Sequence, residues 1–332
     1  MGRPSFLPGQ TGGWVQLVTL SATLEKATQL TQHRYIIISP VKDEDKYIEQ
    51  TLRSVAEQTV QPLLWVIVDD GSRDRTLEIA EQYEGRFRWI RIHKISRDHA
   101  RKPGSAVVHA FNTGLQFIDG IAFDFIVKLD GDLNLPPDYF ERLFAKFDAD
   151  NTLGIASGVF LEREGDTWTV ISMPAYHTAG ASKVVRASCF AQIGGFVASR
   201  GWDTVDEIRA QIHGWKTAHF TDIKFQHLKR EGSGIGAIRT NVMYGEIYYL
   251  TGGGAFFLFL KILHRAWTRR PIVLAALAIV WGYIRFCRLR PQRLVTEEEA
   301  RHYRTILNHR ITAAFSHAVW RPGPKIAAGG NS

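Results

Sequence analysis

The distribution of apolar residues along the first half of the chain alternates between two patterns. Short runs rich in β-branched residues predict buried strands at 35–39, 63–68, 87–95, 125–129 and 153–160. Between them, apolar residues at helical spacing predict helices at 45–58, 74–83, 104–118 and 136–147. Strands that alternate with helices through short connections are typical of an α/β fold, with a mostly parallel sheet flanked by helices.

The pattern is less regular over the next hundred residues. Residues 161–182 show no clear periodicity and are interpreted as irregular. The sequence then predicts helices at 184–193 and 203–213, a strand at 215–220 and a basic, glycine-containing loop at 227–236.

Long apolar runs replace the alternation after Gly234. They cover 255–263 and 272–284, and the second is thirteen uncharged residues flanked by arginines. A bilayer-spanning helix needs about 20 apolar residues, so this run is short for a span. The flanking arginines and nearby aromatic residues favour a helix lying on an anionic cytoplasmic leaflet. A buried core helix and one short membrane segment are the alternatives.

These patterns divide the chain into four parts. We expect an N-terminal extension at 1–33, an α/β catalytic domain at 34–233, a helical membrane-associated region at 234–320 and a flexible tail at 321–332.

Polar residues follow several of the predicted strands. In sheets of this kind, ligands bind beyond the carboxyl ends of the strands, and Ser39, Asp69 and Asp130 fall at such ends. Asp130 and Asp132 flank Gly131, and two carboxylates at a strand end can hold Mg²⁺ or Mn²⁺ against a diphosphate. A simple turn is the alternative, because Asp and Gly are common turn residues.

Composition narrows the classes of partner and compartment. The net charge is +8, but the basic residues lie beside apolar runs rather than beside stacking aromatics, so we expect no nucleic-acid partner. Cys189 and Cys287 match no metal spacing and indicate a reducing compartment. Residues 1–34 show no secretory signal. Together these features predict a location on the cytoplasmic face of the cell membrane.

Four segments taken together resemble glycosyltransferase family 2, whose members have the GT-A fold. They read I-I-I-S-P-V-K-D-E-D-K-Y-I at 36–48, V-I-V-D-D-G-S-R-D-R-T at 66–76, K-L-D-G-D at 128–132 and I-G-G-F at 193–196. The resemblance covers about 35–230. Residues beyond Gly234 more loosely resemble the membrane-proximal tails of bacterial polysaccharide- and glycolipid-assembly members.

The resemblance implies a function and its partners. We expect an inverting, metal-dependent enzyme that uses Mn²⁺ or Mg²⁺ and moves one sugar from a nucleotide-sugar, with UDP as the expected nucleotide. The expected acceptor is lipid-linked or a polysaccharide at an anionic membrane surface. Processive relatives usually carry Gln-x-x-Arg-Trp, which Q-H-L-K-R at 226–230 does not match, so single-sugar transfer is expected.

The resemblance also assigns residues to the nucleotide and the sugar. These are Ser39, Pro40, Glu44, Asp69, Lys102, Asn112, Asp130, Lys229 and Arg230. Asp43 stands where the family usually has Asn, and Glu44 fits the motif. For Asn112 a helix C-cap with Gly114 is the alternative, and for Lys229 and Arg230 a solvated charge run is the alternative to a clamp on the diphosphate.

The metal ligands implied by the resemblance come from two segments. Asp132 is the expected direct ligand, and Asp130 is expected at the ribose or at a metal-bound water. His227 is the candidate third ligand, although a lone histidine is more often structural.

The base implied by the resemblance is Asp203. Arg209 and Gly214 follow in the family's register, whereas Trp202 replaces the usual Glu. Asp206 is the second candidate, and a plain helix N-cap is the alternative for Asp203. A base here would take the proton from the acceptor hydroxyl, which predicts inversion by a single displacement.

Two other classes of protein were weighed. A nucleotidyltransferase predicts a Gly-rich, basic loop after the first strand, and residues 39–45 contain none. A non-catalytic membrane-associated scaffold predicts loss of the strand-end acids, and these acids are present.

Overall fold

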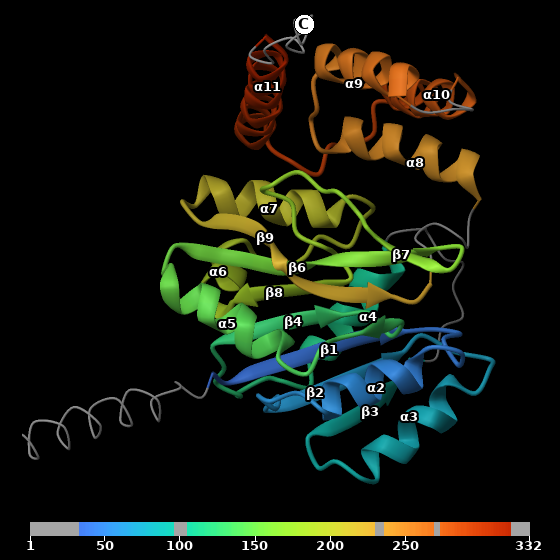
Figure 1. The fold of residues 1–332 in the computed structure, drawn as a ribbon, viewed down its shortest axis with the longest axis vertical. Helices are drawn as coiled ribbons and strands as arrows, with labels where there is room; N and C mark the ends of the chain where they lie inside the picture. The colour runs from blue at the N-terminus through green and yellow to red at the C-terminus, as the bar shows by residue number, and fades with distance from the viewer. Residues whose placement is uncertain (1–32, 96–104, 230–235, 269–272, 320–332) are drawn as a thin grey trace, which may run out of the picture.

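A computed structural model describes residues 33–95, 105–229, 236–268 and 273–319 (Figure 1). Within these ranges nine strands form one sheet. The strands are β1 (Tyr35–Val41), β2 (Leu64–Asp69), β3 (Ile90–Lys94), β4 (Phe125–Leu129), β5 (Leu133–Asn134), β6 (Leu153–Glu164), β7 (Thr167–Val170), β8 (Ser182–Arg186) and β9 (Lys216–His227). The helices are α2 (Ile48–Ala56), α3 (Thr76–Glu84), α4 (Ala106–Leu115), α5 (Tyr139–Ala149), α6 (Ala187–Gln192), α7 (Trp202–Ile212), α8 (Ala237–Leu250), α9 (Ala255–Thr268), α10 (Val273–Leu289) and α11 (Glu297–Val319).

The sheet is mixed rather than mostly parallel. Its order is β3-β2-β1-β4-β8-β6-β9-β5, and β7 pairs with β6. The half formed by β3, β2, β1 and β4 is parallel, as predicted. In the other half, β8 runs antiparallel to both β4 and β6, and β5 runs antiparallel to β9. The prediction was therefore wrong for these pairings, although β6 and β9 in the same half are parallel.

Two local predictions also failed there. The segment 184–193, expected to be one helix, is strand β8 followed by the short helix α6. Val184 and Val185 are fully buried between β4 and β6, and β-branched residues pack well in such a strand. The segment 161–182 is not wholly irregular, since β6 continues to Glu164 and turns back into β7 through Gly165, whose φ is +62°.

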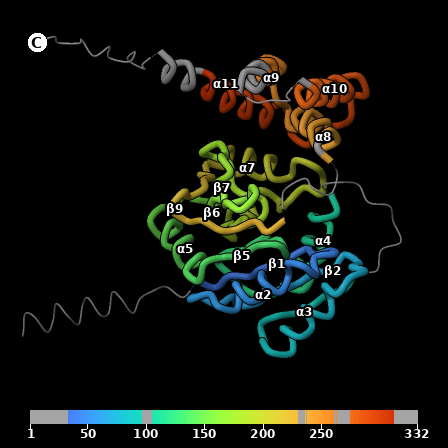
Figure 2. The backbone as a smooth tube through the Cα atoms, turned by 45° about the vertical axis from the view of Figure 1, so that its right-hand side comes forward, coloured from blue at the N-terminus to red at the C-terminus, as the bar shows by residue number. Residues whose placement is uncertain are grey.

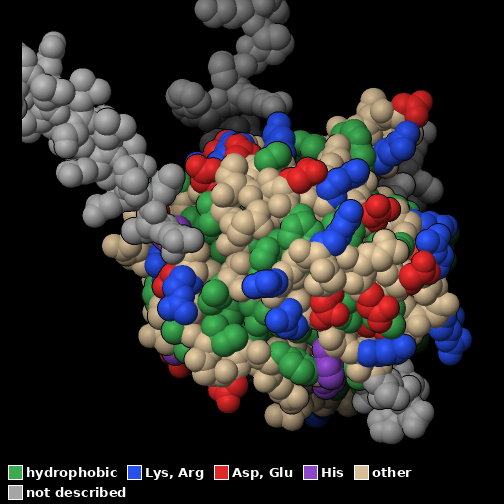
Figure 3. All heavy atoms as spheres, turned by 90° about the horizontal axis from the view of Figure 1, so that it is seen from below, with side chains coloured by type: hydrophobic (Ala, Val, Ile, Leu, Met, Phe, Trp, Pro, Cys, Tyr) green, Lys and Arg blue, Asp and Glu red, His purple; other side chains and the backbone are tan. Residues whose placement is uncertain are grey.

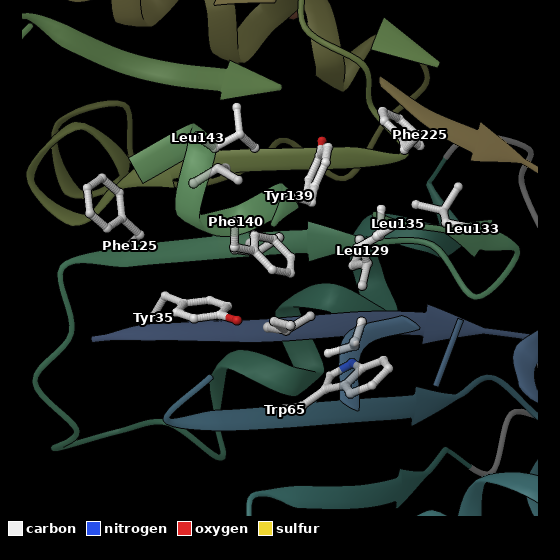
Figure 4. Close-up of a cluster of buried hydrophobic side chains, with 14 of the residues drawn as sticks. Tyr35, Trp65, Phe125, Leu129, Leu133, Leu135, Tyr139, Phe140, Leu143 and Phe225 are labelled. Carbon is white, nitrogen blue, oxygen red and sulfur yellow. The ribbon is translucent and has the colours of Figure 1, made fainter. Parts of the chain in front are cut away.

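Apolar side chains fill both faces of the sheet. Figure 4 shows one cluster, which contains Tyr35, Trp65 and Phe125 from three adjacent strands and Phe140 of α5. The ring centroids of Tyr35 and Phe140 are 4.9 Å apart. On the other face α4 packs on β1 and β2. There Gly114 permits the close approach, because a Cβ at this position would lie 2.5 Å from Cγ2 of Ile38. Large buried apolar areas of this kind dominate the stability of the fold.

The C-terminal helices form a further layer over α7, as Figures 1 and 2 show. Val205 and Ile208 of α7 share an apolar cluster with Tyr248, Ile279 and Leu307 from α8, α10 and α11. The predicted helical character of this region is confirmed, and its association with a membrane stays a prediction. Among the described residues, no helix combines the length and apolar content needed to cross a membrane.

Helices α8 and α10 approach each other at two glycines. A Cβ on Gly245 would lie 2.0 Å from the carbonyl oxygen of Ile279, and one on Gly282 would lie 2.1 Å from that of Val242. Glu246, buried beside this crossing, accepts a hydrogen bond of 2.9 Å from Arg285 of α10 and also pairs with Arg200, which precedes α7. The contact is thus both close-packed and charge-paired.

The surface charge is mixed on at least one face. On the face shown in Figure 3, Lys and Arg side chains are interspersed with Asp and Glu, and hydrophobic side chains lie among them. The net charge of +8 is therefore not gathered on that face.

Candidate active site

The carboxyl ends of the central parallel strands form one rim, as predicted. Val41 pairs with Asp69 at the ends of β1 and β2, and Asp130 follows directly after β4. Ser39, however, lies inside β1 rather than at its end. Its buried hydroxyl oxygen accepts a hydrogen bond of 2.9 Å from Nε1 of Trp65, and Pro40 next to it is buried too. Any role of these two residues at a nucleotide would thus fall to the backbone.

Asp69 holds the turn that follows β2. Its buried carboxylate accepts hydrogen bonds from the backbone N–H of Ser72, at 3.1 Å, and from the Ser72 hydroxyl. The neighbouring Asp43 has a positive φ of 53° and accepts a bond of 2.8 Å from the backbone N–H of Arg73. Asn and Asp tolerate this left-handed conformation better than most residues, which accounts for Asp43 at a position where Asn is usual.

Gly131 brings the two acids of D-G-D close to the end of β1. A Cβ at Gly131 would lie 2.9 Å from Cγ1 of Val41, so a larger residue would push the strand end and the loop apart. Asp130 forms an ion pair with Lys128, whose ammonium also donates to the carbonyl oxygen of Gly180 at 2.9 Å. The loop is therefore a constrained structure rather than a free turn.

Asp132 lies beside the end of β9. Its backbone oxygen accepts a hydrogen bond of 2.8 Å from Leu228, and its Oδ2 is 3.4 Å from Nε2 of His227. Nδ1 of His227 faces Glu162 at 3.7 Å. The structure thus brings Asp132 and His227 together, with the imidazole between two carboxylates.

Glu44 joins this group from the other side. Its Oε1 accepts a hydrogen bond of 2.7 Å from Nζ of Lys229, so Lys229 is paired rather than part of a solvated charge run. Burial raises the pKa of Glu44 to about 7, and the charges of Asp132 and Asp130 add to the rise while Lys229 opposes it. Two buried oxygens here, Oε2 of Glu44 and Oδ1 of Asp132, have no hydrogen-bond partner among the described residues.

These unpaired oxygens suit a hard cation that completes its shell with phosphate. In the described part of the chain, no three His, Cys, Asp or Glu side chains are arranged to hold a metal ion by themselves. Mg²⁺ is commonly bound by one or two carboxylates together with substrate phosphates, and buried polar atoms generally have partners in the working molecule. The donor set therefore fits a cation that arrives with a diphosphate, while His227 as its third ligand stays a prediction.

A cavity of about 510 Å³ lies beside the acids. Residues from the sheet, from α7 and from the C-terminal helices line it, and they include Lys128, Asp130, Tyr176, His177, Trp202, Asp203, His227, Tyr248 and Arg310. Asp130, Asp203 and His227, which were singled out from three separate stretches of sequence, thus share one cavity. The C-terminal helices α8 and α11 contribute part of its wall.

Asp203 is placed as a base would be. It lies in the first turn of α7, but the N-cap of that helix is Gly201 and no side chain caps it. Its carboxylate lines the cavity and makes no hydrogen bond or ion pair with another described residue. The helix N-cap alternative is therefore not what the structure has.

Asp206 occupies a different environment. It is fully buried, and its two carboxylate oxygens lie 3.0 and 2.8 Å from Nζ of Lys183, which is itself fully buried. Burial raises the pKa of Asp206 to about 7, against the lowering effect of Lys183. Because Asp206 belongs to a buried ion pair and does not line the cavity, its prediction as the second base is not supported.

Trp202 takes the place of the family's acid in an unexpected way. Its ring receives two ammonium groups, with Nζ of Lys183 5.0 Å and Nζ of Lys128 5.5 Å from the ring centroid. An aromatic face attracts such cations. The tryptophan thus supplies an electron-rich face between two lysines, each of which also pairs with a carboxylate, Lys128 with Asp130 and Lys183 with Asp206.

Of the remaining residues predicted at the nucleotide-sugar, Asn112 lies in the described part of the chain and Lys102 and Arg230 do not. Asn112 lies within α4, which continues to Leu115, so Asn112 and Gly114 do not cap the helix. The side chain of Asn112 makes no hydrogen bond to a described residue, and its role at the donor stays a prediction. Lys102 and Arg230 lie outside the described residues.

Sequence reasoning missed His177 and Glu207. Nδ1 of His177 lies 2.9 Å from Oε2 of Glu207, while Oε1 of Glu207 accepts bonds of 2.7 Å from the N–H and the hydroxyl of Thr178. Burial alone would lower the pKa of His177, but the Glu207 carboxylate raises it to about 9. No motif marks this pair, since its two members come from an apparently irregular segment and from the middle of a helix.

Comparison with known proteins identifies the domain that carries this site. The family model described as glycosyl transferase family 2 matches residues 36–200. The chain is 29% identical over 135 residues to the uncharacterized glycosyltransferase EpsJ of Bacillus subtilis, covering 41% of this chain and 36% of that protein. It is 32% identical over 124 residues to the chondroitin synthase of Pasteurella multocida, covering 36% of this chain and 12% of the synthase. The chain thus spans only part of the length of these relatives.

Solved structures share the fold over most of the chain. The mannosyltransferase PcManGT from Pyrobaculum calidifontis, in complex with GDP-Man and Mn²⁺, superimposes with a TM-score of 0.53 at 17% identity, covering 92% of this chain and 95% of its own. Residues 1–349 of TarS from S. aureus, in complex with UDP-GlcNAc, give a TM-score of 0.53 at 15% identity and cover 84% and 92%. At such identities the likeness concerns the GT-A-like α/β fold alone.

Proposed function

The chain belongs, through its residues 36–200, to glycosyltransferase family 2, and from that premise we propose that it transfers one sugar from a nucleotide-sugar to an acceptor hydroxyl with inversion. The observation that carries the proposal is the shared cavity, because it places the unengaged carboxylate of Asp203 with Asp130 at the strand-end rim. The family match favours this activity over the nucleotidyltransferase and the non-catalytic scaffold.

Each group in the cavity has a proposed part in the reaction. Asp203 accepts the proton of the acceptor hydroxyl as its oxygen attacks the anomeric carbon. The bond from that carbon to the diphosphate breaks, and its electron pair leaves with the nucleoside diphosphate. Asp130 and Asp132 lie where the diphosphate and ribose are expected, and a divalent cation held there would neutralise charge on the leaving group. Lys229, paired with Glu44, is near enough to this group to add a positive charge.

The choice of donor rests on the structural relatives and on the family resemblance. PcManGT was solved with GDP-Man and Mn²⁺, and TarS with UDP-GlcNAc. We propose a UDP-sugar with Mn²⁺ or Mg²⁺, and the test is a panel of UDP-, GDP- and dTDP-sugars incubated with Mn²⁺, the protein and lipid extract. Release of nucleotide from one donor, abolished by a chelator, is the expected result. Release from none of them contradicts the proposal.

The base is tested by Asp203→Asn. The variant should bind donor nucleotide as before but lose transfer by about 10²–10⁴-fold, the range typical of a general base. Asp166→Asn, in the exposed turn between β6 and β7, is the matched control and should keep full activity. Transfer that survives in Asp203→Asn would show that another group takes the proton. Inversion is read separately from the anomeric configuration of the product by NMR.

We also propose that the C-terminal helices hold the enzyme on the cytoplasmic face of the membrane, near a lipid-linked or polysaccharide acceptor. In α10, Leu274, Leu277 and Trp281 are 68%, 58% and 57% exposed, and their i, i+3, i+7 spacing puts them on one side of the helix. Arg285 and Arg288 follow directly. Apolar side chains next to arginines are typical of helices that lie on anionic lipid.

Vesicle binding tests this second proposal. The protein should sediment with vesicles of phosphatidylglycerol and phosphatidylcholine, and less with phosphatidylcholine alone. Leu277→Glu with Trp281→Glu should abolish sedimentation without changing nucleotide binding, whereas Phe117→Glu, an exposed aromatic position near the end of α4, is the control. Equal sedimentation of all three proteins would contradict the proposal.

A further inference from the structure

Two cationic side chains line the cavity and have no part in the mechanism above. His177 comes from the segment between β7 and β8, and Arg310 comes from α11. Both share the cavity with the candidate base Asp203. The two lysines near Trp202 are already paired with carboxylates, because Lys128 pairs with Asp130 and Lys183 pairs with Asp206.

His177 is held as a cation by a buried partner. Glu207 is fully buried, its carboxylate accepts two hydrogen bonds from Thr178, and its Oε2 lies 2.9 Å from Nδ1 of His177. Since the pKa of His177 is raised to about 9 by this carboxylate against the effect of burial, the ring is protonated at neutral pH and is no general base. With Nδ1 occupied by Glu207, Nε2 is the ring nitrogen left for a ligand in the cavity.

Arg310 provides the second positive charge. Its guanidinium lies 5.9 Å from the ring centroid of Tyr176 and 5.7 Å from that of Phe257. No ion pair joins it to a carboxylate in the part of the chain that the structure describes. Aromatic rings orient a guanidinium without neutralising it. A guanidinium has five N–H donors, so the hydrogen bond between Arg310 and Tyr176 leaves other donors for an anion.

We infer that His177 and Arg310 bind an oxyanion of the acceptor, a phosphate or a carboxylate, and so select an anionic acceptor. This inference rests on the proposed transferase function and names its second substrate by class. Charge-assisted hydrogen bonds to an oxyanion are about twice as strong as neutral ones, and both cationic side chains line the cavity that Asp203 also lines. An acceptor held there by its charge presents its hydroxyl in the same cavity as Asp203.

The test separates acceptor binding from donor binding. The full chain is first titrated with UDP and GDP in Mn²⁺, and absence of binding to both would contradict the proposed function itself. With nucleotide bound, the protein is then titrated with methyl β-glucuronide, glucose 1-phosphate and neutral methyl β-glucoside, and dissociation constants are measured by ligand-observed NMR. At least one anionic probe should bind ten-fold or more tightly than the neutral glycoside, and which probe binds tighter identifies the carboxylate or the phosphate as the source.

Two variants assign the effect to these side chains. Arg310→Gln, on an exposed helix position, and His177→Gln should each weaken the anionic probe ten-fold and leave nucleotide affinity unchanged. Arg301→Gln, also exposed on α11 but outside the cavity, is the matched control and should bind like the original chain. Equal binding of neutral and anionic probes, or loss of nucleotide affinity in the same proportion in both variants, would overturn the inference.

Discussion

Replacing Lys183 by Met should show that the Lys183–Asp206 pair stabilises the fold rather than catalysing the reaction. Both side chains are fully buried, and the ammonium lies 2.8 and 3.0 Å from the carboxylate oxygens and 3.6 Å from Oε1 of Glu207. Removing one partner of such a pair leaves an uncompensated buried charge and costs about 3–5 kcal/mol. For 332 residues, at about 2.1 cal/mol/K of unfolding entropy per residue, the cost corresponds to a fall in Tm of roughly 4–7 °C.

Two companion variants make the assay decisive. Lys216→Met removes the exposed pair between Lys216 and Asp150, 2.7 Å apart, and should cost about 1 kcal/mol or less. Lys183→Met combined with Asp206→Leu should recover most of the lost stability, since neither change leaves a charge from this pair unpaired. The free energy of unfolding and Tm are measured at pH 7.5 by denaturant titration and calorimetry.

One result would refute this reasoning. If Lys183→Met unfolds within about 1.5 °C of the original chain, roughly the shift for 1 kcal/mol, the pair contributes little to stability. If Asp206→Asn also abolished transfer with an unchanged Tm, Asp206 would be the base after all.

Two further outcomes follow from other contacts. Gly245→Ala should destabilise the chain by about 1–3 kcal/mol, because its Cβ would meet the Ile279 carbonyl oxygen at 2.0 Å, whereas Gly85→Ala, with its nearest neighbour 3.6 Å away, should be near neutral in the same denaturant titration. The pH dependence of unfolding should reveal the ion pair of His177 with Glu207. Because the pKa of His177 is raised to about 9 from about 6.5 unfolded, its stabilisation is full below about pH 6.5 and is lost as the pH rises through 9. His177→Gln should flatten the curve in that window. The charged groups that act on the His177 ring are Glu207, Lys183 and Asp203.

The parallel half of the sheet could be predicted because local sequence decides it. The strands β1, β2 and β4 are β-branched runs buried on both faces, and their turns place acids at the carboxyl ends. That topology alone predicts that Asp69 and Asp130 share a rim, and the structure confirms it. The antiparallel pairings of β8 were missed because β8 is a strand only between its neighbours β4 and β6. Its run continues directly into α6, so the two were interpreted as one helix.

The residues in and around the cavity likewise divide into those that a sequence motif indicated and those that only tertiary packing brings there. Asp203 was predicted as the base because a family register surrounds it, and it lines the cavity. Sequence spacing does not reveal that Lys183 faces Asp206 inside the core. His177 and Glu207 are 30 residues apart, and Arg310 belongs to a helix far along the chain. Contacts of this kind depend on tertiary packing, and no local pattern marks them.

Part of the proposed acceptor side lies beyond the residues that the family model matches, although His177 lies within them. The acids of the strand-end rim lie within residues 36–200, the part that the family model matches, and it is there that the donor is expected. Asp203 and the cavity wall from α8 and α11, including Tyr248 and Arg310, lie beyond that match. A wall built outside the matched region is free to differ between relatives that share the donor side. Changes in α8 and α11 should therefore alter the use of acceptor while leaving nucleotide affinity unchanged, and changes at Asp130 or Asp132 should do the reverse.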